Sequence, residues 1–445
     1  MKKFLALMLA LCMTFSLAAC GSSDDDGGDA SSASDASASS TEEEAGSDAS
    51  SEAEGEVSSS AEGEATAADS DLKIGIVLVG DENEGYTYAH IEGIQEAAAS
   101  LGISDDQILW KYSISEDESC YDACIDLVES GCTLVITNSY GHQSYCQQAA
   151  SECPDVQFVA LTGDTANQAG LDNFHNAFTC VYQSRYVSGV VAGMKIAELV
   201  ENGELSDDNY DADGNVKIGY VGAYPYAEVV SGYTAFFLGV QSVYENVSME
   251  VQYTNSWFDL TGEYEAAKAL ISDGCVIIGQ HADSTGAPSA CQEMYESGTT
   301  VYSVGYNIDM LSVAPDAALT SATNVWSVYY EYVFSCMLNG EEIATDWAEG
   351  YDAGAVAITA LGDSCAEGTA DKVAEVEAAL MDGSLQVFDC STFTIDGETP
   401  TSILIDMDLD YVGDTEGVVD GVFQESVLRS APGFSARIDG ITELN

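Results

Sequence analysis

The sequence predicts an α/β protein with two similar lobes, each built on a parallel β-sheet. From residue 72 onward, short apolar runs alternate with segments of helical length, as in parallel sheets that are covered on both faces. The run KIGIV at 73–77 returns as KIGYV at 217–221, and the same order of elements follows each copy. The part of the chain with this pattern is about 375 residues long, which suits two lobes better than one core.

The first lobe is expected to begin with a buried strand, after which helices and strands alternate. Strands are expected at 72–80, 108–112, 133–138 and 157–161, and helices at 87–101, 119–130, 143–152 and 184–200. A polar loop at 201–215 then separates the two series of elements.

The second lobe opens with the segment 216–259, which predicts a strand, an aromatic loop, a helix at 227–244 and a second strand at 249–254. Such βαβ units place ligands at the carboxyl ends of their strands, and both ends here carry aromatic residues beside acids. This arrangement predicts one wall of a pocket for a flat molecule that forms hydrogen bonds. Further elements are expected as a helix ending at 273, strands at 276–279 and 300–305, helices near 290–296, 326–338 and 370–381, and short strands around 388, 393 and 403–407.

The N-terminal segment has the features of an export signal. Residues 1–19 join a basic start to a short apolar run and are followed by Cys20, so LAAC at 17–20 resembles a bacterial lipobox. The sequence predicts lipidation of Cys20 and anchoring on the extracytoplasmic face of the cell membrane, with an ordinary secretory signal as the alternative. Residues 20–70 predict a disordered acidic tether, because they lack the apolar residues needed for a core.

The strongly negative net charge makes two classes of partner unfavourable. A formal net charge of −65 disfavours nucleic acid, since phosphate binding requires clustered Lys and Arg. The basic residues, Arg185 among them, are scattered singly, so an anionic ligand is also disfavoured.

The cysteines and the other motifs predict no catalytic or metal chemistry. Of 13 cysteines, Cys12 belongs to the signal and Cys20 to the anchor, and most of the rest are expected to be buried free thiols, with one or two disulfides left open. Cys120, Cys124, His142 and Cys146 have a zinc-like spacing but fall on separate predicted helices. No nucleophile elbow or phosphate-binding loop occurs, so the sequence predicts neither an enzyme nor a bound cofactor or metal.

Eight motifs carry a resemblance to a known family, and they lie at 85–93, 138–141, 154–158, 185–193, 224–229, 255–259, 280–284 and 305–310. In this order they resemble the basic membrane protein family, the purine- and nucleoside-binding lipoproteins of ABC importers. The resemblance implies a type I periplasmic-binding-protein fold, in which two Rossmann-like lobes hold the ligand in a cleft. Lobe 1 is expected at about 71–184 plus about 303–335, and lobe 2 at about 185–302 plus C-terminal segments.

The resemblance also implies residues that contact the ligand. Stacking aromatics are expected at Tyr86, Tyr140, Tyr224 and Trp257, and polar contacts at Asp81, His90, Ser139, Glu228, Asp259, Asp283, Asn307 and Asp309. His281 is added because it follows a predicted strand. Strand-end aromatics also suit ordinary lobe packing, and His90 equally suits a structural role within its helix.

The resemblance implies a purine ligand and the subunits of an importer as partners. Nucleoside-binding members commonly have Asp where Asn307 stands and Lys where Asn324 stands, which favours a free base such as adenine over a nucleoside. The expected partners are an ABC permease, its ATPase and the membrane through the anchor, with the receptor itself a monomer. The alternatives are a receptor of the same fold for a flavin, thiamine or a glycoside, a nucleoside hydrolase, or a sensor.

Overall fold

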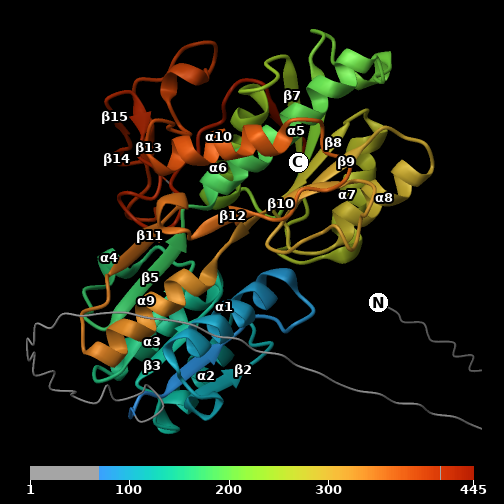
Figure 1. Cartoon of the computed structure of the whole chain (residues 1–445). Coiled ribbons are helices and arrows are strands. Elements are labelled where there is room, and N and C mark those ends of the chain that lie inside the picture. The colour runs from blue at the N-terminus through green and yellow to red at the C-terminus, as the bar shows by residue number, and fades with distance from the viewer. Residues whose placement is uncertain (1–69, 411) are drawn as a thin grey trace, which may run out of the picture. The chain divides into compact units, whose positions relative to one another are not determined.

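The computed structural model describes residues 70–410 and 412–445 (Figure 1). The predicted signal, the lipidation of Cys20 and nearly all of the tether lie outside the described residues.

The first sheet has six strands in the order β11-β5-β4-β3-β1-β2, and all of its pairs are parallel. Its strands are β1 (Ile74–Val77), β2 (Ile108–Lys111), β3 (Leu134–Thr137), β4 (Gln157–Leu161), β5 (Phe174–Thr179) and β11 (Asp346–Glu349).

The second sheet has seven strands in the order β12-β10-β9-β8-β6-β7-β17, and only the pair of β12 with β10 is antiparallel. Its strands are β6 (Val216–Gly222), β7 (Val247–Tyr253), β8 (Ile277–Gln280), β9 (Tyr302–Tyr306), β10 (Ala318–Asn324), β12 (Val356–Ile358) and β17 (Ile441–Glu443). Both sheets therefore share the order 2-1-3-4-5 in their first five strands, which places a topological switch point between β1 and β3 and between β6 and β8.

Helices flank both sheets, and short turns and hairpins complete the described residues. The helices are α1 (Gly85–Leu101), α2 (Glu118–Glu129), α3 (Gln143–Glu152), α4 (Ala166–Ala169), α5 (Val181–Asn202), α6 (Ala227–Gln241), α7 (Leu260–Ser272), α8 (Gly286–Glu296), α9 (Trp326–Asn339) and α10 (Thr369–Met381). Single 3₁₀ turns occur at Asp105–Gln107, Tyr140–His142, Asp207–Asn209, Tyr351–Ala353 and Cys390–Thr392. Two small hairpins pair β13 (Leu404–Ile405) with β14 (Thr415–Glu416) and β15 (Val418–Val419) with β16 (Val422–Phe423).

The α/β class with two parallel-sheet lobes is confirmed, but five strands of the two sheets were not predicted: β5, β10, β11, β12 and β17. β5 and β10 carry buried polar residues in their interiors, so neither forms the continuous apolar run that marks strands such as β1 and β3. The strands expected around Phe388 and Phe393 do not form. Instead, Phe434 stacks on Phe388 at 4.5 Å between ring centroids and meets Phe393 edge-on, so this segment is held by aromatic packing.

The chain passes between the sheets three times. It leaves the first sheet after β5 to form α5, returns after β10 to form α9 and β11, and leaves again from β11 to β12 (Figure 1). The boundary expected near residue 303 falls within β9, whereas β9 and β10 both pair in the second sheet and the crossing follows Asn324. The pattern of alternating elements continues through β9 without a break, so it gives no sign of where the chain crosses.

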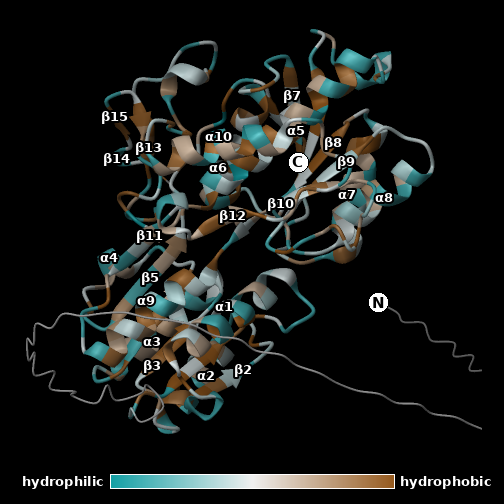
Figure 2. Cartoon of the chain, in the orientation of Figure 1, coloured by the Kyte–Doolittle hydropathy of each residue, from teal (hydrophilic) through white to brown (hydrophobic). Residues whose placement is uncertain are grey.

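The core follows from alternation along the strands. In β1, Ile74 and Ile76 pack on one face with α1 and α9, whereas Val77 packs on the other with α2 and α3. Strands such as β3 and β12 are accordingly brown in Figure 2. Eleven cysteines of the described residues are free thiols, most of them buried as the sequence predicted.

Candidate ligand-binding cavity

A cavity of about 440 Å³ lies between the carboxyl ends of the strands of the two sheets. The segments after β1, β2, β3 and β4 contribute one wall, and those after β6, β7 and β8 and the end of β9 contribute the other. This is the place that parallel sheets favour, because the strand ends beside the switch point leave a crevice. Its volume is within the range of small-molecule sites.

Aromatic rings from both sheets line this cavity. Tyr224 meets Trp257 edge-on at 5.2 Å and stacks at 5.1 Å on Tyr226, which lies just outside. From the other wall, Tyr140 approaches Tyr226 at 6.1 Å. Tyr86 is held by its hydroxyl, which donates to the carbonyl oxygen of Asn138. The rings can therefore offer π-faces to a flat ligand from two sides.

The carboxyl groups of the first wall are held by neutral donors. Asp81 accepts from the backbone and the side-chain amide of Asn83, which lowers the pKa of Asp81. Glu84 accepts from Thr87 at 2.5 Å, while burial raises the pKa of Glu84. Glu116 accepts from the Ser139 hydroxyl at 2.6 Å and from a backbone amide at 3.0 Å.

The carboxyl groups of the second wall are more deeply buried. Burial raises the pKa of Glu228 to about 7 and raises the pKa of Asp283 well above its usual value. Burial lowers the pKa of His281 well below 6.5, so this imidazole is neutral, and its Nε2 shares a hydrogen bond of 3.3 Å with Glu228. Asp283 accepts from the side-chain amide of Asn307 at 2.7 Å.

Arg185 lies behind this second wall and was not predicted to belong to the site. Its guanidinium is buried, donates through Nη1 to the carbonyl oxygen of Gln280 at 2.5 Å and stacks on Tyr306 at 3.6 Å. Its charge lowers the pKa of Glu228 and of Asp283, against the larger effect of burial. A basic residue that stands alone in the sequence thus lies next to the acids of the cavity.

The structure places nine of the thirteen predicted ligand contacts along the cavity. They are Asp81, Tyr86, Ser139, Tyr140, Tyr224, Glu228, Trp257, His281 and Asp283.

The other four predicted contacts do not line the cavity. Buried His90 bonds the Tyr330 hydroxyl through Nδ1 at 2.7 Å and stacks on Trp326. Asp259 caps α7, and Asp309 accepts from the backbone of a turn. Asn307 lies behind the residues that line the cavity, where its side-chain amide donates to Asp283.

The cavity also contains residues that were not predicted. They are Val79, Gly80, Asn83, Glu84, Ser113, Glu116, Thr162, Ser256, Phe258 and Tyr306. Glu116 and Thr162 follow β2 and β4, so extending the strand-end rule to every strand of the first sheet would have found them.

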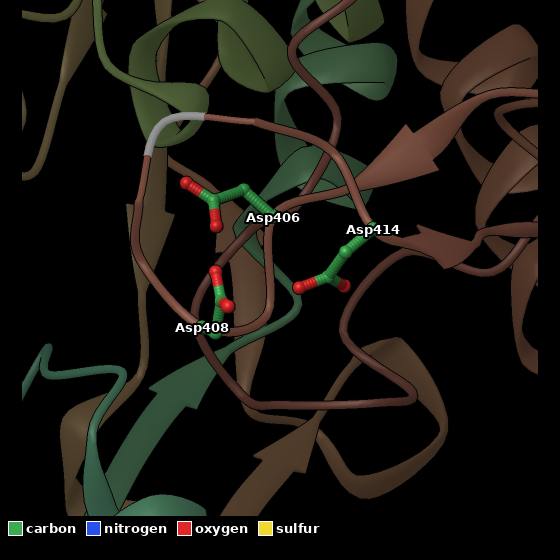
Figure 3. A group of neighbouring side chains, drawn as sticks. All are labelled: Asp406, Asp408 and Asp414. Atoms are coloured by element: carbon green, nitrogen blue, oxygen red, sulfur yellow. The ribbon is translucent and has the colours of Figure 1, made fainter.

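A second acidic group lies outside the cavity. Asp406, Asp408 and Asp414 point into the space enclosed by one loop (Figure 3), with carboxylate oxygens within 4.8 Å of one another. Asp414 accepts from Thr415 at 2.5 Å, and Asp408 is exposed.

No helix of the described residues is long and apolar enough to cross a membrane.

Comparison with known proteins identifies the family. Residues 72–388 match the model of the Bmp family, described as PnrA-like ABC transporter substrate-binding proteins. The chain belongs to this family. The family is one of solute-binding proteins and the predicted resemblance is confirmed.

Similar proteins differ in the ligand that their names state. A purine-binding protein of Brucella abortus is 32% identical over 62% of this chain and 71% of its own length. A Haloferax volcanii protein that carries the name of an ABC transporter glucose-binding protein is 26% identical over 75% of this chain and 78% of its own length. The structure of a solute-binding protein from Aeropyrum pernix superposes with a TM-score of 0.59 at 14% identity, over 76% of this chain and 95% of that one, and shows the same fold.

Proposed function

We propose that this chain is the receptor of an ABC importer and captures a purine base or a purine nucleoside between its two lobes. The observation that carries the proposal is the lining of the cavity, where aromatic rings from both walls surround hydrogen-bonding side chains. A purine needs this combination, because its faces stack and its edge alternates donors with acceptors. The Brucella relative, named for purine binding, supports the same class of ligand.

Tyr86 and Tyr140 would contact the ligand from the first wall, and Tyr224 and Trp257 from the second. Asp81, Ser139, Glu228, His281 and Asp283 would bind its edge. Because the two walls belong to different sheets, a ligand that touches both stabilises the closed arrangement of the lobes. The closed form would then be presented to the permease and its ATPase, with Cys20 carrying the lipid that holds the receptor at the outer face of the cell membrane.

A glycoside or a simple sugar is the second candidate. The Haloferax relative is named for glucose, and aromatic rings with carboxylates also bind sugar hydroxyls. Thermal-shift measurements with adenine, guanine, their nucleosides, glucose, thiamine and riboflavin separate these classes. A shift that saturates with purines alone supports the proposal, and a shift with sugars alone overturns it.

A further inference from the structure

The cavity contains five carboxyl groups, and no Lys or Arg side chain lines it. Asp81, Glu84, Glu116, Glu228 and Asp283 all lie along its wall. Among residues 70–410 and 412–445, none of the five forms an ion pair with Lys or Arg. Their hydrogen-bond partners are hydroxyl groups, amides and a neutral imidazole.

Among the described residues, two cationic side chains lie behind the lining, one near each wall. Arg185 is buried beneath Tyr306, and its guanidinium carbon lies 3.6 Å from the centre of that ring. It acts on Glu228 and Asp283, whereas none of the three carboxyl groups of the first wall is paired with a cation of the described residues. Arg429 pairs with Asp164 at 3.6 Å behind the first wall, and its charge lowers the pKa of Tyr140 against the larger effect of burial.

The aromatic rings favour the same kind of ligand. The faces of Tyr and Trp rings attract cations, and this attraction grows when water is excluded. Tyr86, Tyr140, Tyr224, Trp257 and Tyr306 are all part of the lining. A neutral ligand would remove water from several carboxylates without offering them an opposite charge. A cation would form ion pairs with the acids and would also be attracted to the faces of the rings.

We propose that the ligand of this cavity binds as a flat organic cation and, within the purine class, as a purine whose ring is positively charged. Methylation of adenosine at N1 produces such a purine. The inference rests on the proposed function only in naming a purine as the ligand. The positive charge of the ligand is inferred from the residues that line the cavity.

The test uses isomers of equal size. 1-Methyladenosine is a cation at neutral pH, whereas N6-methyladenosine is neutral and has the same number of carbon and nitrogen atoms. Calorimetric titration of the purified protein at pH 7.5 should give at least tenfold tighter binding for 1-methyladenosine.

Isosteric variants connect this preference to the carboxyl groups. Glu84→Gln and Glu228→Gln should each reduce the ratio of the two affinities severalfold, because each removes one negative charge and little volume. Glu265→Gln, at an exposed position of α7 that does not line the cavity, should leave the ratio unchanged.

The outcomes separate this inference from the proposed function. Equal or tighter binding of the neutral isomers overturns the inference and leaves purine capture standing. Binding of thiamine, a non-purine cation, without binding of any purine supports the preference for a cationic ligand and overturns the proposed capture of a purine. If neither cations nor purines bind while glucose does, both fail.

Discussion

The two lobes share a scaffold but present different chemistry to the cavity. Gly75 and Gly219 occupy the same place in the repeated strand. A side chain at either would crowd a leucine of the second helix of its lobe, Leu127 of α2 at 2.8 Å or Leu270 of α7 at 3.0 Å. The first wall supplies acids that mainly neutral donors hold near solvent, whereas the second wall supplies buried acids beside aromatic rings and Arg185. The comparison indicates that strand order fixes where the ligand binds, while loops after the strands fix its chemistry.

The helix pairs beside the repeated strands should differ most strongly. A side chain at Gly239 of α6 would lie 2.1 Å from the carbonyl oxygen of Tyr186 in α5, whereas one at Gly93 of α1 would lie 2.8 Å from the backbone nitrogen of Ser327 in α9. Gly239→Ala should lower the free energy of unfolding by about 3 kcal/mol, and Gly93→Ala by about 1 kcal/mol. Thermal or urea unfolding measures both. The reverse order would show that α1 and α9 are the tighter pair.

Loss of the Trp257 ring should weaken ligand binding more than any other single aromatic truncation. Trp257→Ala should cost about 2 kcal/mol of affinity for the ligand found in the screen, by analogy with the stacking of bases on aromatic rings. Calorimetry measures it, with Trp110→Ala as the control, since Trp110 packs against Tyr112 outside the cavity lining. Unchanged affinity in Trp257→Ala would remove this ring from the site.

Glu228→Gln should stabilise the ligand-free protein at high pH. The pKa of Glu228 is about 7 in the folded state against 4.5 for the ordinary carboxyl group, so burial of the charge costs nothing below pH 4.5 and its full amount above pH 7. The variant should therefore exceed the wild type by about 3 kcal/mol at pH 8 and match it at pH 4.5.

Melting temperatures across this pH range check the expectation. A difference that does not change with pH would show that the carboxylate is not destabilised. The titratable and charged groups around Glu228 are Tyr86 of α1, Asp164, Arg185 of α5, His281, Asp283 and Tyr306 of β9.

Removal of the charge behind the second wall should have a smaller effect, visible as a shift in pH dependence. Arg185→Gln should raise the pKa of Glu228 by about one unit, because the guanidinium lowers it in the wild type. The midpoint of the pH dependence of ligand affinity should move upward by the same amount. Arg437→Gln, which removes a cation paired with Glu443 outside the cavity lining, should leave the midpoint in place. An unmoved midpoint in Arg185→Gln would contradict the coupling.

Much of this architecture is predictable because apolar strands and the repeated KIGIV segment are local signals. Strands β5 and β10 could not be predicted in this way, because their buried polar residues form hydrogen bonds with neighbours that only the fold provides. Asn176 in β5, for example, accepts from the backbone of Ala166 at 2.6 Å and donates to the carbonyl oxygen of Ala160 at 2.9 Å. Such residues resemble loop residues until their partners are known.

Cavity residues were predictable as segments but not as individual side chains. Trp257 and Asp259 lie two positions apart in one motif, yet the ring lines the cavity while the carboxylate caps the next helix. Asn307 has a positive φ of 63° and directs its amide to Asp283 instead of into the cavity. The direction of a side chain after a strand depends on the turn, which the pattern of residue types does not specify.

Trp257 gives the most direct test of purine capture between the lobes. The chain has four tryptophans, and Trp257 is the one among them that lines the cavity of the described residues. Titration with purine bases and nucleosides, charged and neutral, should quench tryptophan fluorescence with saturation, and Trp257→Phe should abolish most of that change. The absence of a saturable change with every purine, or an equal change in Trp257→Phe, would contradict the account.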